Sequence, residues 1–132
     1  MRPVRFADTE HETFFVSMMK RAGVYDSYHK ALFYTLGICP DTREHMGDLF
    51  DFKEQLIKPE GLAKGWQTGG SRRVTRLAFN LWNGWREEGA EGLSTPYELF
   101  DCDFAPYFLE AIRIKYPDYC REIREGSREK QR

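Results

Sequence analysis

Apolar side chains recur along most of this chain at the three- and four-residue spacing of an α-helix. The clearest stripe lies within residues 71–88 and predicts one long helix with an apolar face of Val74, Leu77, Ala78, Leu81, Trp82 and Trp85. Only Val4-Arg5-Phe6 is strand-like, and it is too short to build a sheet. The pattern therefore predicts an all-α fold of about five or six helices, with residues 1–125 as a single domain and residues 126–132 as a charged tail.

Capping signals divide the chain into helices. Thr or Asp followed three residues later by Glu occurs at Thr9, Asp41 and Thr95, and predicts a helix N-terminus at each. Glycines in residues 59–71 and 89–93 predict loops. The expected helices cover residues 9–22, 26–37, 41–59 with a break near Phe50, 71–88, a segment from 95, and 103–116 capped by Asp103.

Aromatic side chains supply much of the expected core. The 132 residues include ten Phe, seven Tyr and three Trp, which can fill a small core densely. Tyr28 falls among the positions that its helix is expected to bury. Phe79 falls off the apolar stripe toward the polar side, and an outward-facing Phe79, Phe104 or Tyr107 would mark a partner surface.

Composition excludes several classes of protein. No run reaches the roughly 18 apolar residues of a transmembrane helix. Acidic residues follow the N-terminal Met1-Arg2-Pro3, where a signal peptide would be apolar. The three cysteines are an odd number without a close pair, which indicates free thiols in a reducing compartment. We therefore expect a cytoplasmic protein that does not associate with a membrane.

Charge is segregated along the chain although the net charge is only −1. Residues 53–76 carry six basic and two acidic side chains, whereas residues 77–112 carry one basic and seven acidic. The basic segment leads through Gly69-Gly70-Ser71 into the long helix, so free backbone amides, the positive end of the helix dipole and three arginines coincide. This combination predicts a phosphate, nucleic-acid or partner-binding surface of Lys64, Trp66, Arg72, Arg73, Arg76 and Asn80.

These residues also allow a plainer interpretation. Arginine and asparagine opposite an apolar stripe are typical of any solvated helix face, and the arginines can pair with the acidic segment. No catalytic residue, cofactor or metal is predicted: the three histidines lie at no metal-ligand spacing, and Asp101 beside Cys102 disfavours a thiolate. The carboxylates of Asp48, Asp51 and Glu54 would share a helical face but are typical of a solvated stripe.

Several blocks of the chain resemble one known family. They are Tyr28–Gly37, Phe52–Glu54 with Ile57–Leu62, Ser71–Trp82 and Thr95–Phe100. Together they make the chain similar to an uncharacterised domain-of-unknown-function family of small Firmicutes proteins, often carried on phages and integrated mobile elements. The resemblance covers residues 26–119 and implies a bacterial cytoplasmic setting, but it brings no catalytic residue with it.

Two hypotheses of function follow. The first is a non-enzymatic binding protein that docks on a protein partner, as a regulator or an inhibitor of a host factor. The second is a small nucleic-acid-binding protein that uses the basic residues 58–76. The near-neutral charge favours the first hypothesis, and the oligomeric state is left open. An exposed apolar patch would favour the first, and one coherent basic face the second.

Overall fold

The computed structural model describes residues 3–123, whose regular backbone is mostly helical. The α-helices are α1 (Thr9–Ala22), α2 (Ser27–Leu36), α3 (Pro40–Glu44), α4 (Gly69–Asn83), α5 (Pro96–Leu99) and α6 (Ala105–Lys115). Three 3-10 helices, η1 (Met46–Asp48), η2 (Pro59–Ala63) and η3 (Glu91–Ser94), and one hairpin, β1 (Phe50–Asp51) with β2 (Leu56–Ile57), complete the described part. The expected all-α class is confirmed, and the expected tail over residues 126–132 lies outside the described residues.

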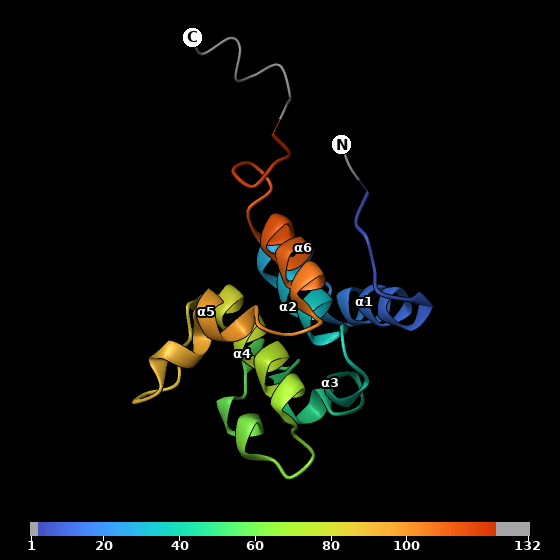
Figure 1. The fold of residues 1–132 in the computed structure, drawn as a ribbon. Helices are drawn as coiled ribbons and strands as arrows, with labels where there is room; N and C mark the ends of the chain where they lie inside the picture. Colours follow the sequence, from blue (N-terminus) through green and yellow to red (C-terminus); the bar gives the residue numbers. More distant parts are fainter. Residues whose placement is uncertain (1–2, 124–132) are drawn as a thin grey trace, which may run out of the picture.

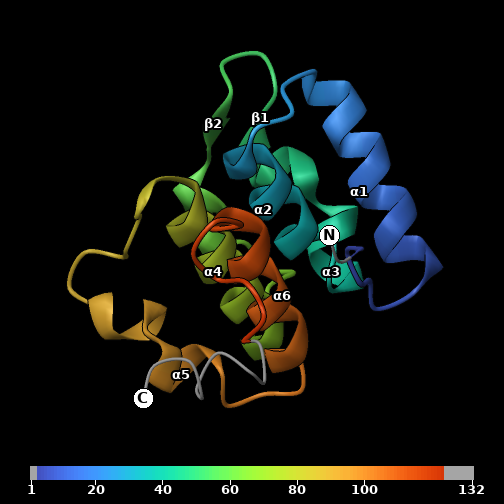
Figure 2. The same cartoon turned by 90° about the horizontal axis from the view of Figure 1, so that it is seen from above.

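Helix α2 is the centre of the packing. It contacts α4 most extensively, followed by α6 and α1, and Figure 2 shows it between α1 on one side and α4 and α6 on the other. Seven of its ten residues are buried. A helix that is apolar nearly all round must be covered on every side, which explains why three helices surround this one (Figure 1).

Two of the expected capping boxes are displaced toward the N-terminus, by one residue at α1 and by two at α3. Asp8, not Thr9, caps α1, because its side chain accepts a hydrogen bond from the amide of His11 at 2.8 Å. Helix α3 begins at Pro40 rather than being capped by Asp41, because proline suits the first helical position. The hydroxyl of Thr42 is buried and donates to the carbonyl oxygen of Leu36.

The helix expected to continue through residues 50–59 is absent, and a hairpin stands in its place. The carboxylate of Asp51 accepts hydrogen bonds from the amides of Lys53 and Glu54 at 2.9 and 3.0 Å, which turns the chain. The strands then pair antiparallel, with Phe50 opposite Ile57. This local side-chain bonding competes with the helix that the apolar spacing suggested.

Helix α4 begins earlier and ends earlier than expected. Thr68 and Ser71 form a reciprocal capping box, so Gly69 and Gly70 are the first two helical residues rather than a flexible loop. Gly84, at φ +79°, ends the helix, and its amide donates to the carbonyl oxygen of Asn80 at 2.8 Å. The expected end at residue 88 was therefore wrong by about one turn.

The remaining corrections concern α6 and two aromatic residues. Phe104, not Asp103, occupies the N-cap of α6, and no side chain caps it. Tyr28 is exposed rather than buried, whereas Phe79 is fully buried with the Trp85 ring edge-on at 5.5 Å. The turn at Gly84 folds Trp85 back over α4, so this helix buries a wider face than its stripe indicated.

Candidate binding surfaces

The basic side chains predicted to bind an anion lie on the first half of α4. Arg72 and Arg76 border two neighbouring hollows of about 170 and 230 Å³, and Arg73 borders the first only. The first hollow also contains Gly69, at the N-terminus of α4, so all three arginines border a hollow at this helix end. The other lining residues are Leu93 and Glu98 in the first hollow, and Pro59, Leu62, Ala63, Trp85 and Glu87 in the second.

Two of the three arginines are engaged by the protein itself. Arg73 donates from Nε to the carbonyl oxygen of Glu98 at 3.0 Å. Arg76 donates from Nη2 to a carboxylate oxygen of Glu87 at 3.1 Å and is largely buried. Both bonds fasten α4 to the segment that follows it. The side chain of Arg72 makes no hydrogen bond or ion pair within residues 3–123, so among the three it is the guanidinium that the described residues leave open to a ligand.

The other predicted site residues are dispersed. Trp66 stacks on the His45 ring at 4.2 Å and donates from Nε1 to Asp48 at 2.9 Å, so one face of its indole is covered. Asn80 donates to the carbonyl oxygen of Trp85 at 3.2 Å. Lys64 is exposed at the end of η2 and lines neither hollow. The binding role of these residues stays a prediction.

Acidic side chains share both hollows with the arginines. Glu98 borders the first, and Glu87 borders the second. Since nucleic acid presents a row of phosphates, carboxylates at both positions oppose its approach. The hollows are suited to a single anionic group beside Arg72 better than to a polyanion.

The carboxylates considered as a metal or acid–base group do not form one. Asp48 accepts from Trp66, and Asp51 is occupied by the amides of the hairpin turn. They share no helical face, because residues 50–57 form the hairpin. Within residues 3–123 no group of three or more His, Cys, Asp or Glu side chains is placed to hold a metal ion.

A second surface, which sequence reasoning missed, lies where the start of α2 meets the end of α6. We call it the tyrosine surface and define it as Tyr28, Lys115, Tyr116 and Tyr119. The ammonium of Lys115 lies 4.3 Å from the centroid of the Tyr28 ring and 4.6 Å from that of Tyr116. Tyr119 follows three residues beyond Tyr116, and its backbone amide donates to the carbonyl oxygen of Tyr116 at 3.2 Å.

The tyrosine surface is open to solvent. Tyr28, Tyr116 and Tyr119 are 48%, 43% and 87% exposed. Lys115 makes no ion pair with any residue that the structure describes, so its charge is balanced only by the ring faces. Tyr28 lies more than 80 residues from its partners in the chain, and no local spacing links them. The one sequence clue was a tyrosine cluster near a helix end that Pro117 terminates.

Comparison with known proteins gives a family and no function. A family model described as a family of unknown function (DUF6075) matches residues 1–128. No curated protein and no solved structure matches the chain. None of the helices within residues 3–123 combines the length and the apolar character needed to span a bilayer.

Proposed function

We propose that this chain, which belongs to the DUF6075 family of unknown function, is a non-enzymatic binding protein that acts through a protein partner. The observation that carries the proposal is the tyrosine surface. Two exposed tyrosine rings lie against one lysine that has no carboxylate partner among the described residues, and a third exposed tyrosine, Tyr119, follows shortly after in the chain. Tyrosine is enriched at protein interfaces, because it buries a large rigid ring and keeps a polar hydroxyl for hydrogen bonding.

The arginine side of α4 supports this choice over nucleic-acid binding. Arg73 is hydrogen-bonded to the backbone carbonyl of Glu98, and Arg76 is paired with the carboxylate of Glu87. The Glu98 and Glu87 side chains also border the same hollows as the arginines. A phosphate-binding surface would instead leave its cations free and group them without acids. The Arg72 side chain is the group that a weaker, secondary contact with an anion would use.

The setting that we propose is the cytoplasm of a bacterium that hosts a phage or an integrated mobile element. It rests on the resemblance to small Firmicutes proteins of that kind, and on the three free cysteines. In that setting, a small protein with an exposed tyrosine surface is suited to regulate or inhibit a host factor by occupying part of its surface.

Site-specific photo-crosslinking in Firmicutes cells tests the proposal. A benzophenone amino acid replaces Tyr119 in one variant and Tyr97 in the other. Both tyrosines are 87% exposed, but Tyr97 lies on α5, outside the tyrosine surface. We expect position 119 to give one discrete protein adduct and position 97 none. Once that partner protein is purified, Lys115→Glu should raise the Kd at least about tenfold, a loss of about 1.4 kcal/mol of binding free energy.

Equal adducts from both positions, or none from position 119, would refute the tyrosine surface as the binding site. The nucleic-acid hypothesis is tested in parallel by fluorescence anisotropy with labelled DNA and RNA at low and physiological salt. Salt-sensitive binding that Arg72→Ala abolishes, and that Arg86→Ala on an exposed loop leaves intact, would move the function to α4.

A further inference from the structure

The three histidines differ in the hydrogen-bond partners of their rings, and the partners define the protonation state that each geometry satisfies. His11 is fully buried and receives a hydrogen bond at Nδ1 from the amide of Ala7 at 3.0 Å. Its Nε2 lies 2.7 Å from the carbonyl oxygen of Tyr34 and therefore donates. One accepting and one donating nitrogen make a neutral imidazole.

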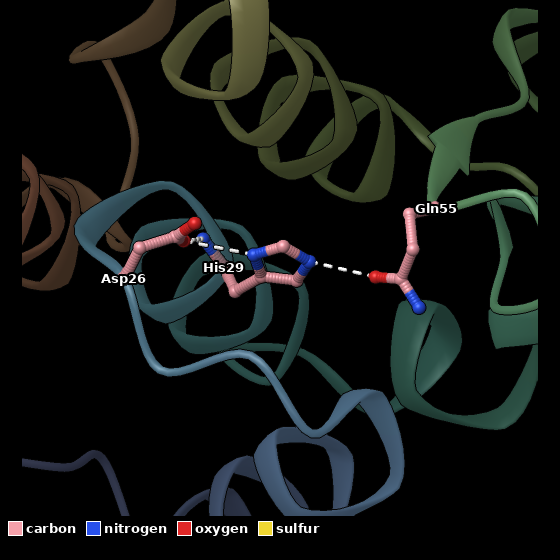
Figure 3. Close-up of polar contacts among 3 residues, drawn as sticks. All are labelled: Asp26, His29 and Gln55. Carbon is pink, nitrogen blue, oxygen red and sulfur yellow. Dashed lines mark hydrogen bonds and ion pairs between the residues drawn. The ribbon is translucent and has the colours of Figure 1, made fainter.

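His29 has the opposite arrangement. It is only 6% exposed, and its Nδ1 lies 2.8 Å from a carboxylate oxygen of Asp26 (Figure 3). Its Nε2 lies 2.7 Å from Oε1 of Gln55. The Gln55 amide is held in this orientation, because its Nε2 donates to the carbonyl oxygen of Phe52 at 2.7 Å. Both ring nitrogens thus face acceptors, an arrangement that only the doubly protonated imidazolium satisfies.

We propose that His29 is a proton-dependent clasp that docks the tip of the β1–β2 hairpin, residues 53–55, on α2. In the closed form, the imidazolium donates one N–H to Asp26 and the other to Gln55. When the pH rises, the Nε2 proton leaves to solvent and the Nδ1 proton stays with Asp26. The Nε2 lone pair then faces the Oε1 lone pairs of Gln55, so this contact becomes repulsive and the hairpin tip is released.

Only the tip of the hairpin depends on this hydrogen bond, because Phe50 is buried in the core and Phe52 stacks on the Phe33 ring at 5.6 Å, whereas Lys53 and Glu54 are exposed. Each strand has two residues, and two residue pairs join them, Phe50 with Ile57 and Asp51 with Leu56. A ribbon this short is marginal without outside contacts. Gln55 has a φ of +57°, in the left-handed region that is unfavourable for a residue with a Cβ atom. Its bond to His29 offsets that cost in the closed form.

Asp26 is the charged group that bonds directly to the His29 ring. Burial raises the pKa of the Asp26 carboxyl, but hydrogen bonds from the amide and the ring of His29 outweigh it and hold this pKa below its ordinary value. Helix α4 contributes the Trp82 ring, edge-on at 4.7 Å, and the hairpin contributes the Phe50 ring. Two cations of the packed helices contact aromatic rings and not His29: Arg21 of α1 lies over the Phe52 ring at 3.9 Å, and Lys115 of α6 lies over the Tyr28 ring at 4.3 Å.

The test follows ring and backbone nitrogens of the full-length protein by ¹⁵N NMR from about pH 5 to pH 9, the range in which an imidazole ordinarily titrates. We expect the two His29 ring nitrogens to be protonated together at low pH. The amides of residues 53–56 should shift with the same midpoint as His29. The midpoint of His11 should not coincide with the hairpin transition.

Two substitutions at Gln55 test whether its acceptor oxygen couples the hairpin tip to the protonation of His29. Gln55→Glu keeps the acceptor and adds a charge, so the His29 and hairpin midpoints should both move to higher pH. Gln55→Met removes the acceptor, so the chemical shifts of the hairpin amides should no longer change at the midpoint of His29. His45→Gln is the matched control, because His45 bonds to the carbonyl oxygen of Asp41 and does not touch the hairpin clasp. Circular dichroism checks that each variant is folded.

Three outcomes would overturn the clasp. One is a His29 ring with a single protonated nitrogen across the whole pH range. Another is a hairpin whose amide shifts ignore the His29 midpoint in the wild type. The third is a Gln55→Glu variant, folded, whose midpoints do not rise. None of these outcomes bears on the tyrosine surface, so the two proposals stand or fall separately.

Discussion

At the scale of single residues, the partners of a side chain decide its chemistry more than its type does. His11 and His29 both lie in the first turn of a helix, and the residue three positions before each is an aspartate that caps the helix. The His11 ring faces the amide of Ala7, whereas the His29 ring faces the carboxylate of Asp26. The same local motif thus yields a neutral and a protonated geometry.

His11 makes stability depend on pH. Burial lowers the pKa of its imidazole below the ordinary 6.5, although the bond to the Tyr34 carbonyl and the charge of Asp8 act to raise it. Below about pH 6.5 the unfolded chain therefore binds a proton that the folded chain does not. We expect the free energy of unfolding to fall as the pH drops below this value, by about 1.4 kcal/mol for each unit of pKa difference.

Urea unfolding at several pH values measures this dependence. His11→Gln should be less stable at neutral pH, since it disturbs two buried hydrogen bonds, and should lose the His11 part of the slope below pH 6.5. An unchanged slope in His11→Gln would contradict the assignment.

At the scale of elements, helix ends depend on which capping bonds form. The Thr68 side chain accepts from the amide of Ser71 at 3.1 Å and opens the longest helix. Thr95 also occupies an N-cap, but its hydroxyl donates back to Gly92 and does not cap α5. Sequence patterns rank Thr95 higher, because it precedes proline and a glutamate.

Thr68→Ala should therefore destabilise the protein by about 1 kcal/mol, the usual cost of a lost N-cap. Thr95→Ala, a matched change at an exposed N-cap, should cost less because no capping bond is lost. Thermal unfolding of the two variants beside the wild type measures the difference. Equal losses would mean that the Thr68 bond adds no stability.

At the scale of the whole molecule, α2 and α4 share one aromatic core. This core covers a wider face of α4 than the apolar stripe in the sequence predicted. Phe79 is completely buried, with Trp85 folded over it.

Phe79→Ala should cost roughly 3–5 kcal/mol, a large part of the stability of a domain of this size. Val16→Ala, on the 57% exposed outer face of α1, should stay within about 0.5 kcal/mol of the wild type. Chemical denaturation compares the two, and a mild Phe79→Ala would show that the site repacks.

The sequence by itself determined the helical class and most helix positions, because helix periodicity and glycine stops act within a few residues. Helix α1 covers residues 9–22 as expected and ends before Gly23, and α2 begins at Ser27, within one residue of the expected start. The same local reasoning failed at residues 50–57, where the Asp51 side chain captures two amides and a hairpin replaces the expected helix.

Tertiary structure alone decided which polar side chains are free. Arg73 and Arg76 are bound by residues 25 and 11 positions further along the chain, and Tyr28 meets Lys115 only because α2 packs against α6. His29 and Gln55 likewise meet across 26 residues. Such long-range pairs leave no period in the sequence, since their partners are set by helix packing rather than by chain neighbours.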